Sequence, residues 1–153
     1  MDHQELNCRS CGHASLEPVL EFGETALADR ILDASEAGQP QLRFSLTLVY
    51  CANCSLLQIA ETVDPTVLFD EHYRYFSSSI PSLVQHAKQL ADQFIHRLRL
   101  TDQSLVVELA SNDGYLLQHF SERGIPVLGV EPCQNFAAEA IRKGIQTKVE
   151  FFS

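Results

Sequence analysis

Four of the five cysteines in this 153-residue chain fall into two Cys-x-x-Cys pairs, Cys8/Cys11 and Cys51/Cys54. Each pair can place two thiolates on one turn, and two such turns supply the four sulfur ligands that zinc binds as a tetrahedron. A four-thiolate site is closed to substrate and stabilises the fold. The spacing therefore predicts one structural zinc ion held by these four cysteines.

Other roles for the cysteines fit the sequence less well. Disulfides are disfavoured in reducing cytosol, and the N-terminus lacks the basic and apolar layout of a secretion signal. A thioredoxin-like redox motif needs a Cys-x-x-Cys pair at a helix start in a βαβ unit, and neither pair has that context. His13 is an alternative ligand beside the first pair. Cys133 is expected to be a buried free cysteine near a helix start.

A second group of residues that could bind a ligand or take part in a reaction is the run 108–115, Glu-Leu-Ala-Ser-Asn-Asp-Gly-Tyr. It lies between a strand-like and a helix-like segment. Asn112, Asp113 and Gly114 tolerate tight or left-handed backbone geometry. The next predicted strand ends in Glu131, whose carboxylate can accept both hydroxyls of an adenosine ribose. Because ligands of open α/β sheets bind at the carboxyl ends of the strands, this pattern predicts a cofactor site.

Charge and glycine content favour S-adenosylmethionine over a dinucleotide at this turn. A dinucleotide fingerprint needs G-x-G-x-x-G, but only Gly114 is present, and Asp113 would repel a pyrophosphate. S-adenosylmethionine has no phosphate and carries cationic sulfonium and ammonium groups, which acidic residues attract. A flavodoxin-like turn without a nucleotide and a nicotinamide-dependent enzyme remain as alternatives.

Two kinds of structure must position these residues. Residues 1–62 predict a small β-rich zinc lobe, with strands at 16–22, 42–48 and 56–59 and a short turn or helix at 26–32. Such a lobe is too short for a large core, so a metal ion would stabilise it.

The remainder of the chain predicts a connector and an α/β domain. Residues 63–100 contain a polar and aromatic connector and a helix that starts at Pro81. Residues 101–153 alternate as β-α-β-α-β, with helices at 115–123 and 136–143, which implies an incomplete Rossmann-like parallel sheet. The other half of that sheet is expected beyond residue 153. The apolar stripe predicted on the first helix contains Leu83, Ala87, Leu90, Phe94 and Leu98.

Composition restricts the partners. With 45% hydrophobic and 20% charged residues the chain is globular, and its formal net charge of −9 argues against a nucleic-acid backbone or an anionic membrane as partner. No run approaches the roughly 18 apolar residues of a membrane span. The composition predicts a soluble, cytoplasmic protein.

Taken together in this order, the motifs resemble the zinc-containing class I methyltransferases that C-methylate nucleotide-linked keto-deoxysugars, over essentially the whole chain. The matching motifs are Cys8-x-x-Cys11, Cys51-x-x-Cys54, Tyr73-x-Tyr75-x-Ser77-Ser78, Val107-Glu108-Leu109-x-Ser111-Asn112-Asp113-Gly114-Tyr115-Leu116-Leu117 and Gly129-Val130-Glu131-Pro132.

The resemblance implies a zinc lobe, an S-adenosylmethionine-binding Rossmann domain and a further C-terminal domain that this chain does not contain. The implied chemistry is removal of a proton next to a sugar ketone, followed by attack of the enolate on the methyl group. Tyr73, Tyr75 and Ser78 would lie near the methionine end of the cofactor or the sugar, and either tyrosine could assist proton transfer. His72 and His86 are weaker candidates. The implied cofactor contacts are Ser111, Asn112, Asp113, Gly114 and Glu131, with Glu108 supporting the turn.

One hypothesis of a different class stays open. The chain could be a non-catalytic zinc-binding module, or a truncated methyltransferase that binds a partner chain and turns nothing over. A half Rossmann sheet would expose an apolar edge and face, which favours association.

Overall fold

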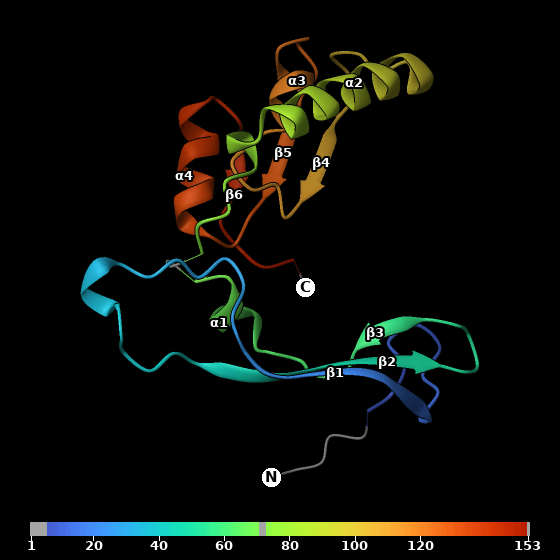
Figure 1. Cartoon of the computed structure of the whole chain (residues 1–153). Coiled ribbons are helices and arrows are strands. Elements are labelled where there is room, and N and C mark those ends of the chain that lie inside the picture. The colour runs from blue at the N-terminus through green and yellow to red at the C-terminus, as the bar shows by residue number, and fades with distance from the viewer. Residues whose placement is uncertain (1–5, 71–72, 153) are drawn as a thin grey trace. The chain divides into compact units, whose positions relative to one another are not determined.

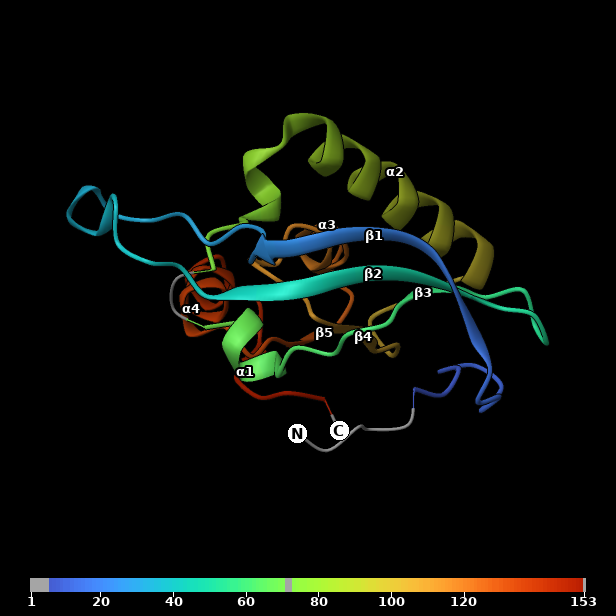
Figure 2. The ribbon, with the colours of Figure 1, turned by 60° about the horizontal axis from the view of Figure 1, so that its bottom comes forward.

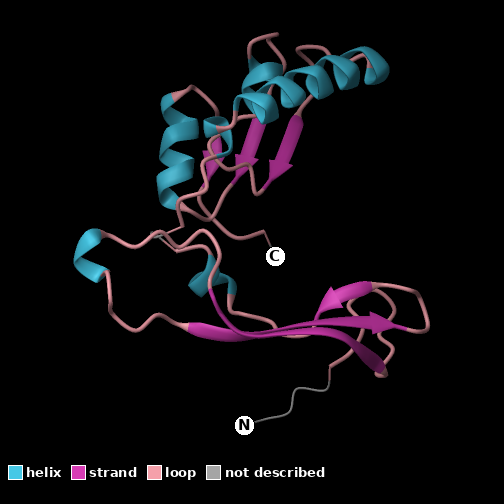
Figure 3. Ribbon diagram, in the orientation of Figure 1, coloured by secondary structure: helices cyan, strands magenta, loops and turns pink. Residues whose placement is uncertain are grey.

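The computed structural model describes residues 6–70 and 73–152, which divide between two compact units, Met1–Leu68 and Phe69–Ser153 (Figure 1). The first unit is mostly strand and loop, whereas the second alternates strands and helices (Figure 3). Within the described residues, no helix is both long and apolar enough to cross a membrane.

The first unit is built on a three-stranded antiparallel sheet in the order β1-β2-β3 (Figure 2). Its strands are β1 (Leu16–Ala26), β2 (Arg43–Cys51) and β3 (Leu57–Ile59), followed by the single-turn helix α1 (Pro65–Leu68). Strand β1 continues past residue 22, where the sequence predicted its end, because its partner β2 pairs along its whole length. Residues 34–36 form a 3₁₀ turn in the connection between β1 and β2.

This unit has a very small apolar core. Among its described residues, the buried apolar side chains are Cys8, Val49 and Cys51, and two of these three are predicted zinc ligands. A segment with so little buried apolar surface cannot offset the entropy of folding by hydrophobic burial alone. The four cysteines are therefore the main stabilising element available to the lobe.

The second unit contains a parallel sheet in the order β4-β5-β6, formed by Val106–Leu109, Val127–Val130 and Thr147–Lys148. The helices α3 (Leu117–Ser121) and α4 (Gln134–Arg142) make the two crossovers. This arrangement confirms the predicted α/β class and the incomplete Rossmann-like β-α-β-α-β pattern. Helix α3 is shorter than the predicted 115–123 at both ends, because residues 115–116 and 122–123 form turns.

Helix α2 (Pro81–Leu98) begins at the predicted proline and is followed by Arg99, whose left-handed backbone (φ 53°) lets the next N–H, that of Leu100, bond the Ile95 carbonyl at 3.1 Å. Its packed face differs from the predicted stripe, because Phe94 and Leu98 are exposed. The small Ala91 side chain is fully buried and packs in one cluster with Phe120 and Ile125. Alanines let the helix lie close to its neighbours, which moves the larger apolar residues to the rim.

Candidate functional site

The two Cys-x-x-Cys segments fold into equivalent turns. In each turn the first cysteine's carbonyl accepts the N–H of the residue four positions later, from Gly12 to Cys8 and from Ser55 to Cys51, both at 2.8 Å. Gly12 and Ser55 both have left-handed backbones, with φ of 74° and 64°. The first cysteine of each pair is buried and the second is exposed. The repeated backbone geometry directs both pairs of thiols to one point.

The four sulfur atoms are spaced as a zinc site requires. All lie within 4.8 Å of one another, with Cys8 Sγ 3.5 Å from Cys54 Sγ and Cys11 Sγ 3.6 Å from Cys51 Sγ. Zinc–sulfur bonds of ~2.3 Å in a tetrahedron put the sulfurs about 3.8 Å apart, whereas a disulfide would need ~2.05 Å. The donors therefore fit a four-thiolate zinc ion and are not disulfide-bonded. His13 contributes its backbone, through a 2.8 Å bond from Cys8 N–H to its carbonyl.

The environment of Cys11 favours the thiolate that a metal needs. The Asn53 side-chain amide donates to Cys11 Sγ at 3.5 Å and, together with the His13 backbone N–H, lowers the pKa of this thiol to about 6. The backbone N–H of Cys11 likewise lowers the pKa of Cys8. Hydrogen bonds of this kind, from backbone and amide groups to the sulfurs, stabilise the thiolate forms of Cys8 and Cys11.

The predicted cofactor turn follows strand β4 and has an unusual backbone. Ala110, Asn112 and Gly114 all have left-handed conformations, with φ of 55°, 50° and 76°. At Gly114 a side chain would also approach Ile145 Cγ1 to 3.1 Å, so both the conformation and the packing require glycine. The alternating left-handed residues keep the turn tight at the carboxyl edge of the sheet.

Glu131 connects this turn to the start of helix α4. Its Oε2 accepts the Asn112 backbone N–H at 2.8 Å, and its Oε1 accepts the Cys133 backbone N–H at 2.9 Å. The carboxylate is buried, yet each oxygen keeps one lone pair, since a carboxylate offers about four acceptor positions. Glu131 thus fixes the turn to the start of α4 and has acceptor positions left for two further donors.

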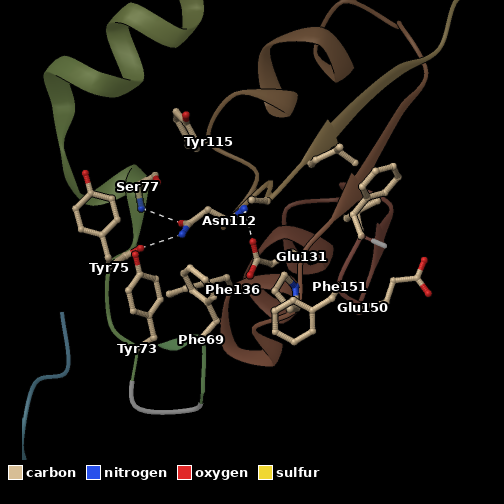
Figure 4. A pocket seen from close by; sticks show the side chains of 15 residues that line it. Phe69, Tyr73, Tyr75, Ser77, Asn112, Tyr115, Glu131, Phe136, Glu150 and Phe151 are labelled. Atoms are coloured by element: carbon tan, nitrogen blue, oxygen red, sulfur yellow. Dashed lines mark hydrogen bonds between the residues drawn. The ribbon is translucent and has the colours of Figure 1, made fainter. Parts of the chain in front are cut away.

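A cavity of about 440 Å³ lies at this edge (Figure 4). Its wall includes the carboxylate of Glu131, the Asn112 side chain and residues of the segment 73–77. Among the described residues that line it, the charged side chains are Glu131 and Glu150, so the cavity presents negative charge and no cation. The aromatic residues of the wall are Phe69, Tyr73, Tyr75, Tyr115, Phe136, Phe151 and Phe152.

Asp113 lies behind the cavity wall. The carboxylate is completely buried, 3.1 Å from the Lys143 ammonium, which also donates to the Asp113 carbonyl at 2.9 Å. The Ser78 hydroxyl donates to the same carboxylate. Lys143 was not singled out from the sequence. Because Asp113 is buried and paired with this lysine, the electrostatic argument for a cationic cofactor passes to Glu131 and Glu150, which line the cavity.

Four further residues implied by the resemblance also lie outside the cavity lining, and one of them is Ser78, whose neighbour Ser77 lines the cavity in its place. Ser111 is fully buried and Gly114 packs against Ile145. Glu108 is partly buried; loss of water raises its pKa to about 8, and the negative charges of Glu131 and Asp113 add to this effect. Glu108 is therefore mostly protonated at neutral pH, in keeping with a role in supporting the turn.

The two tyrosines implied as proton-transfer groups do line the cavity. The ring of Tyr73 packs edge-to-face against Phe69 and Phe136, with centroids 5.3 and 5.6 Å apart. Tyr75 is more exposed, and Figure 4 shows both rings on the same side of the cavity. His86 is on the exposed side of α2, and His72 lies outside the described residues.

Several lining residues were missed by the sequence reasoning. Glu150, Phe151 and Phe152 follow β6, the third parallel strand. Residues 111–114 and 131 were predicted from the rule that ligands bind beyond the carboxyl ends of parallel strands. The same rule predicts the residues that follow β6. Tyr115, which also lines the cavity, was part of a quoted motif but received no role. Asn135 lies outside the lining and belonged to no motif.

The first comparison with known proteins concerns the class. Residues 8–69 match the family model Methyltransf_13, described as "Putative zinc binding domain". This range contains all four clustered cysteines, so the family match and the sulfur geometry together confirm the zinc prediction.

The second comparison concerns a particular relative. The chain is 42% identical, over 141 residues, to a protein from Streptomyces niveus named C-methyltransferase NovU. The match covers 92% of this chain and 33% of NovU, so the chain spans about a third of the relative's length. The two comparisons confirm the resemblance to the N-terminal region of zinc-containing C-methyltransferases.

Proposed function

We propose that this chain is the N-terminal part of an S-adenosylmethionine-dependent C-methyltransferase. The observation that carries the proposal is the cavity at the carboxyl edge of the parallel sheet, with Glu131 in its wall, in a chain 42% identical to a C-methyltransferase. The zinc ion is structural in this proposal, because four thiolates leave no open coordination position.

The cavity suits this cofactor better than a dinucleotide. Its described lining contains two acids and no lysine or arginine, which disfavours a pyrophosphate and favours a cationic ligand. The remaining lone pairs of Glu131 can accept the two ribose hydroxyls. The apolar rings of Phe151 and Phe152 offer a surface on which a base can stack. When bound, the cofactor supplies an electrophilic methyl group on a positively charged sulfur.

The finer proposal concerns the substrate, which would be a nucleotide-linked keto-deoxysugar. A base removes the proton from the carbon next to the ketone, and the C–H electron pair becomes the enolate. The enolate carbon then bonds the methyl carbon while the methyl–sulfur bond breaks and its electron pair stays on sulfur. Tyr73 and Tyr75 are proposed to carry or relay the proton through their hydroxyls. The hydrogen bond from Ser78 to Asp113 is proposed to hold the segment that carries the two tyrosines against the cofactor turn.

Calorimetric titration of the zinc-loaded chain with S-adenosylhomocysteine tests the cofactor proposal. We expect binding to the unmodified chain, no binding of NAD⁺, and a loss of at least about tenfold in affinity for Glu131→Gln, since hydrogen bonds to charged groups contribute ~1.5–3 kcal/mol. The matched control is Asp102→Asn, an exposed acid outside the cavity.

Two outcomes would contradict the proposal. One is the absence of S-adenosylhomocysteine binding to a chain that holds zinc and melts cooperatively. The other is equal affinity for the unmodified chain and a folded Glu131→Gln variant. The first result would favour the non-catalytic zinc module, and binding of NAD⁺ in its place would favour a nicotinamide enzyme.

A further inference from the structure

The segment that carries the two cavity tyrosines is attached to the sheet edge through its backbone. The Tyr75 carbonyl accepts a hydrogen bond from the Asn112 side-chain amide at 2.9 Å. Two residues earlier, the Tyr73 carbonyl accepts one from the Asn135 side-chain amide at 3.1 Å. Asn112 belongs to the turn after β4, and Asn135 to the first turn of α4, which follows β5. Two consecutive strand ends thus each supply one amide.

The Asn112 side chain has little hydrogen-bonding capacity left for a cofactor. Besides donating to Tyr75, its Oδ1 accepts the Ser77 N–H at 2.9 Å and the Asp113 N–H at 3.0 Å. A side-chain amide offers two donors and two acceptor positions, so three of four are engaged with the protein backbone. Figure 4 shows the bonds from Asn112 to residues 75 and 77 and to Glu131.

The rings of the segment are fixed by the residue beside Asn135. Phe136 is completely buried, and it contacts the rings of Tyr73 and Phe76 edge-to-face, with centroids 5.6 and 4.6 Å apart. Ser78 adds a third attachment through Asp113. The start of α4 therefore contacts the Tyr73 backbone and the rings of Tyr73 and Phe76.

We propose that Asn112 and Asn135 form an amide clamp, in which each asparagine acts as a positioning residue that sets where a tyrosine stands in the cavity wall. This inference rests on the proposed function for the role of the tyrosines, and it reassigns the Asn112 side chain from cofactor contact to positioning. Both positions require an amide in particular. An aspartate has the same shape but would turn an oxygen towards a carbonyl oxygen, which repels it and leaves the hydrogen bond unmade.

The test is fluorine NMR of the zinc-loaded chain labelled with 3-fluorotyrosine. The chain has four tyrosines, so four resonances are expected and can be assigned with Tyr→Phe variants. In the absence of any ligand, Asn135→Asp should shift the Tyr73 resonance towards its position in the urea-unfolded chain. Asn112→Asp should do the same to the Tyr75 resonance. The Tyr50 resonance, from the zinc lobe, serves as the internal reference and should not move.

The matched control is Gln134→Glu, which makes the same amide-to-acid change one position before Asn135 on an exposed side chain. It should shift neither tyrosine resonance. If Asn112→Asp fails to fold, as judged by circular dichroism, Asn135→Asp carries the test alone, because Asn135 makes a single side-chain bond.

Folded Asn135→Asp protein with an unshifted Tyr73 resonance would overturn the clamp, as would an equal shift in Gln134→Glu. Because the spectra are recorded without cofactor, this outcome is separate from the titration. Failure to bind S-adenosylhomocysteine would reject the proposed function and leave the clamp standing. In Asn135→Asp we expect the affinity for S-adenosylhomocysteine to fall by less than about threefold, since Asn135 does not line the cavity.

Discussion

Three acids near the cofactor turn have different neighbours and therefore different roles. Asp113 is paired with Lys143, and Glu131 accepts two backbone N–H groups. Glu108 has neither kind of support, and its Oε2 is buried without a hydrogen bond from the described part of the chain. Because a buried carboxylate without such partners is unfavourable in its charged form, Glu108 keeps its proton, and its pKa is raised to about 8.

This raised pKa predicts a pH dependence of stability. Between the usual value of 4.5 and about 8, the folded chain keeps the Glu108 proton while the unfolded chain releases it. The stabilising contribution is therefore complete below pH 4.5 and is lost as the pH rises to about 8, with a slope of at most ~1.4 kcal/mol per pH unit. Since Glu108 is only partly buried, the observed slope should be smaller. Relative to the unmodified chain, Glu108→Gln should become steadily more stable as the pH rises from 5 to 8.5.

Urea unfolding of both proteins across this pH range, followed by circular dichroism, measures the effect. Asp102→Asn, at an exposed acid of the same unit, should differ from the unmodified chain by a constant amount. Parallel stability curves for Glu108→Gln and the unmodified chain would show that Glu108 ionises normally in the folded state.

At the scale of elements, strand β5 lies so close to the cofactor turn that Gly129 has no room for a side chain. A Cβ atom there would overlap Ser111 Oγ and stand 3.1 Å from Ser111 Cβ and 3.2 Å from Thr147 Oγ1. Strands β4 and β6 lie on either side of β5, so the sheet cannot move aside without losing ladder bonds. The absence of a side chain at Gly129 therefore lets the cofactor turn, through Ser111, pack directly against strand β5.

We predict that Gly129→Ala lowers the free energy of unfolding by about 1–3 kcal/mol, the usual cost of overpacking a core. Urea unfolding gives this value directly. Combining Gly129→Ala with Ser111→Gly removes the overlapping side chain, so the two changes should show a coupling energy that restores part of the loss. Additive effects of the two substitutions would mean that the contact with Ser111 is not what limits the site.

At the scale of the whole molecule, the two units depend on different sources of stability. The second unit has clusters of buried apolar residues around Ala91, Phe120 and Leu117, whereas the first has Val49 and the four-cysteine cluster. Structural zinc contributes roughly 10–16 kcal/mol in isolated zinc-finger peptides. Metal binding and folding of the first unit should therefore be one event.

Removal of zinc by a chelator at neutral pH should unfold the first unit and leave the second folded. Hydrogen exchange followed by mass spectrometry should show loss of protection in β1, β2 and β3, with protection retained in α2 and α4. Cys11→Ser should reduce bound zinc well below one ion per chain, and Cys133→Ser, a buried cysteine outside the cluster, should leave it at one. Persistence of protection in β1 and β2 after metal removal would contradict the prediction.

Much of the fold could be predicted because its signals are local. The zinc ligands follow from cysteine spacing, and alternating strand and helix patterns indicated the β-α-β-α-β order, since each depends on residues a few positions apart. The exposed positions of Phe94 and Leu98 could not be predicted, because the periodicity of a helix shows an apolar face but not how closely a neighbour approaches it.

The sequence by itself therefore determined the chemistry available to this protein: four thiols for a metal, and an acid and a tight turn at the edge of a parallel sheet. Only the tertiary structure decided how each polar group is used. Asp113 meets Lys143 across 30 positions of sequence, and Asn135 meets the Tyr73 carbonyl across 62. Which partner a polar group bonds depends on its neighbours in space. Pairings between residues so far apart in the chain leave no periodic pattern in the sequence.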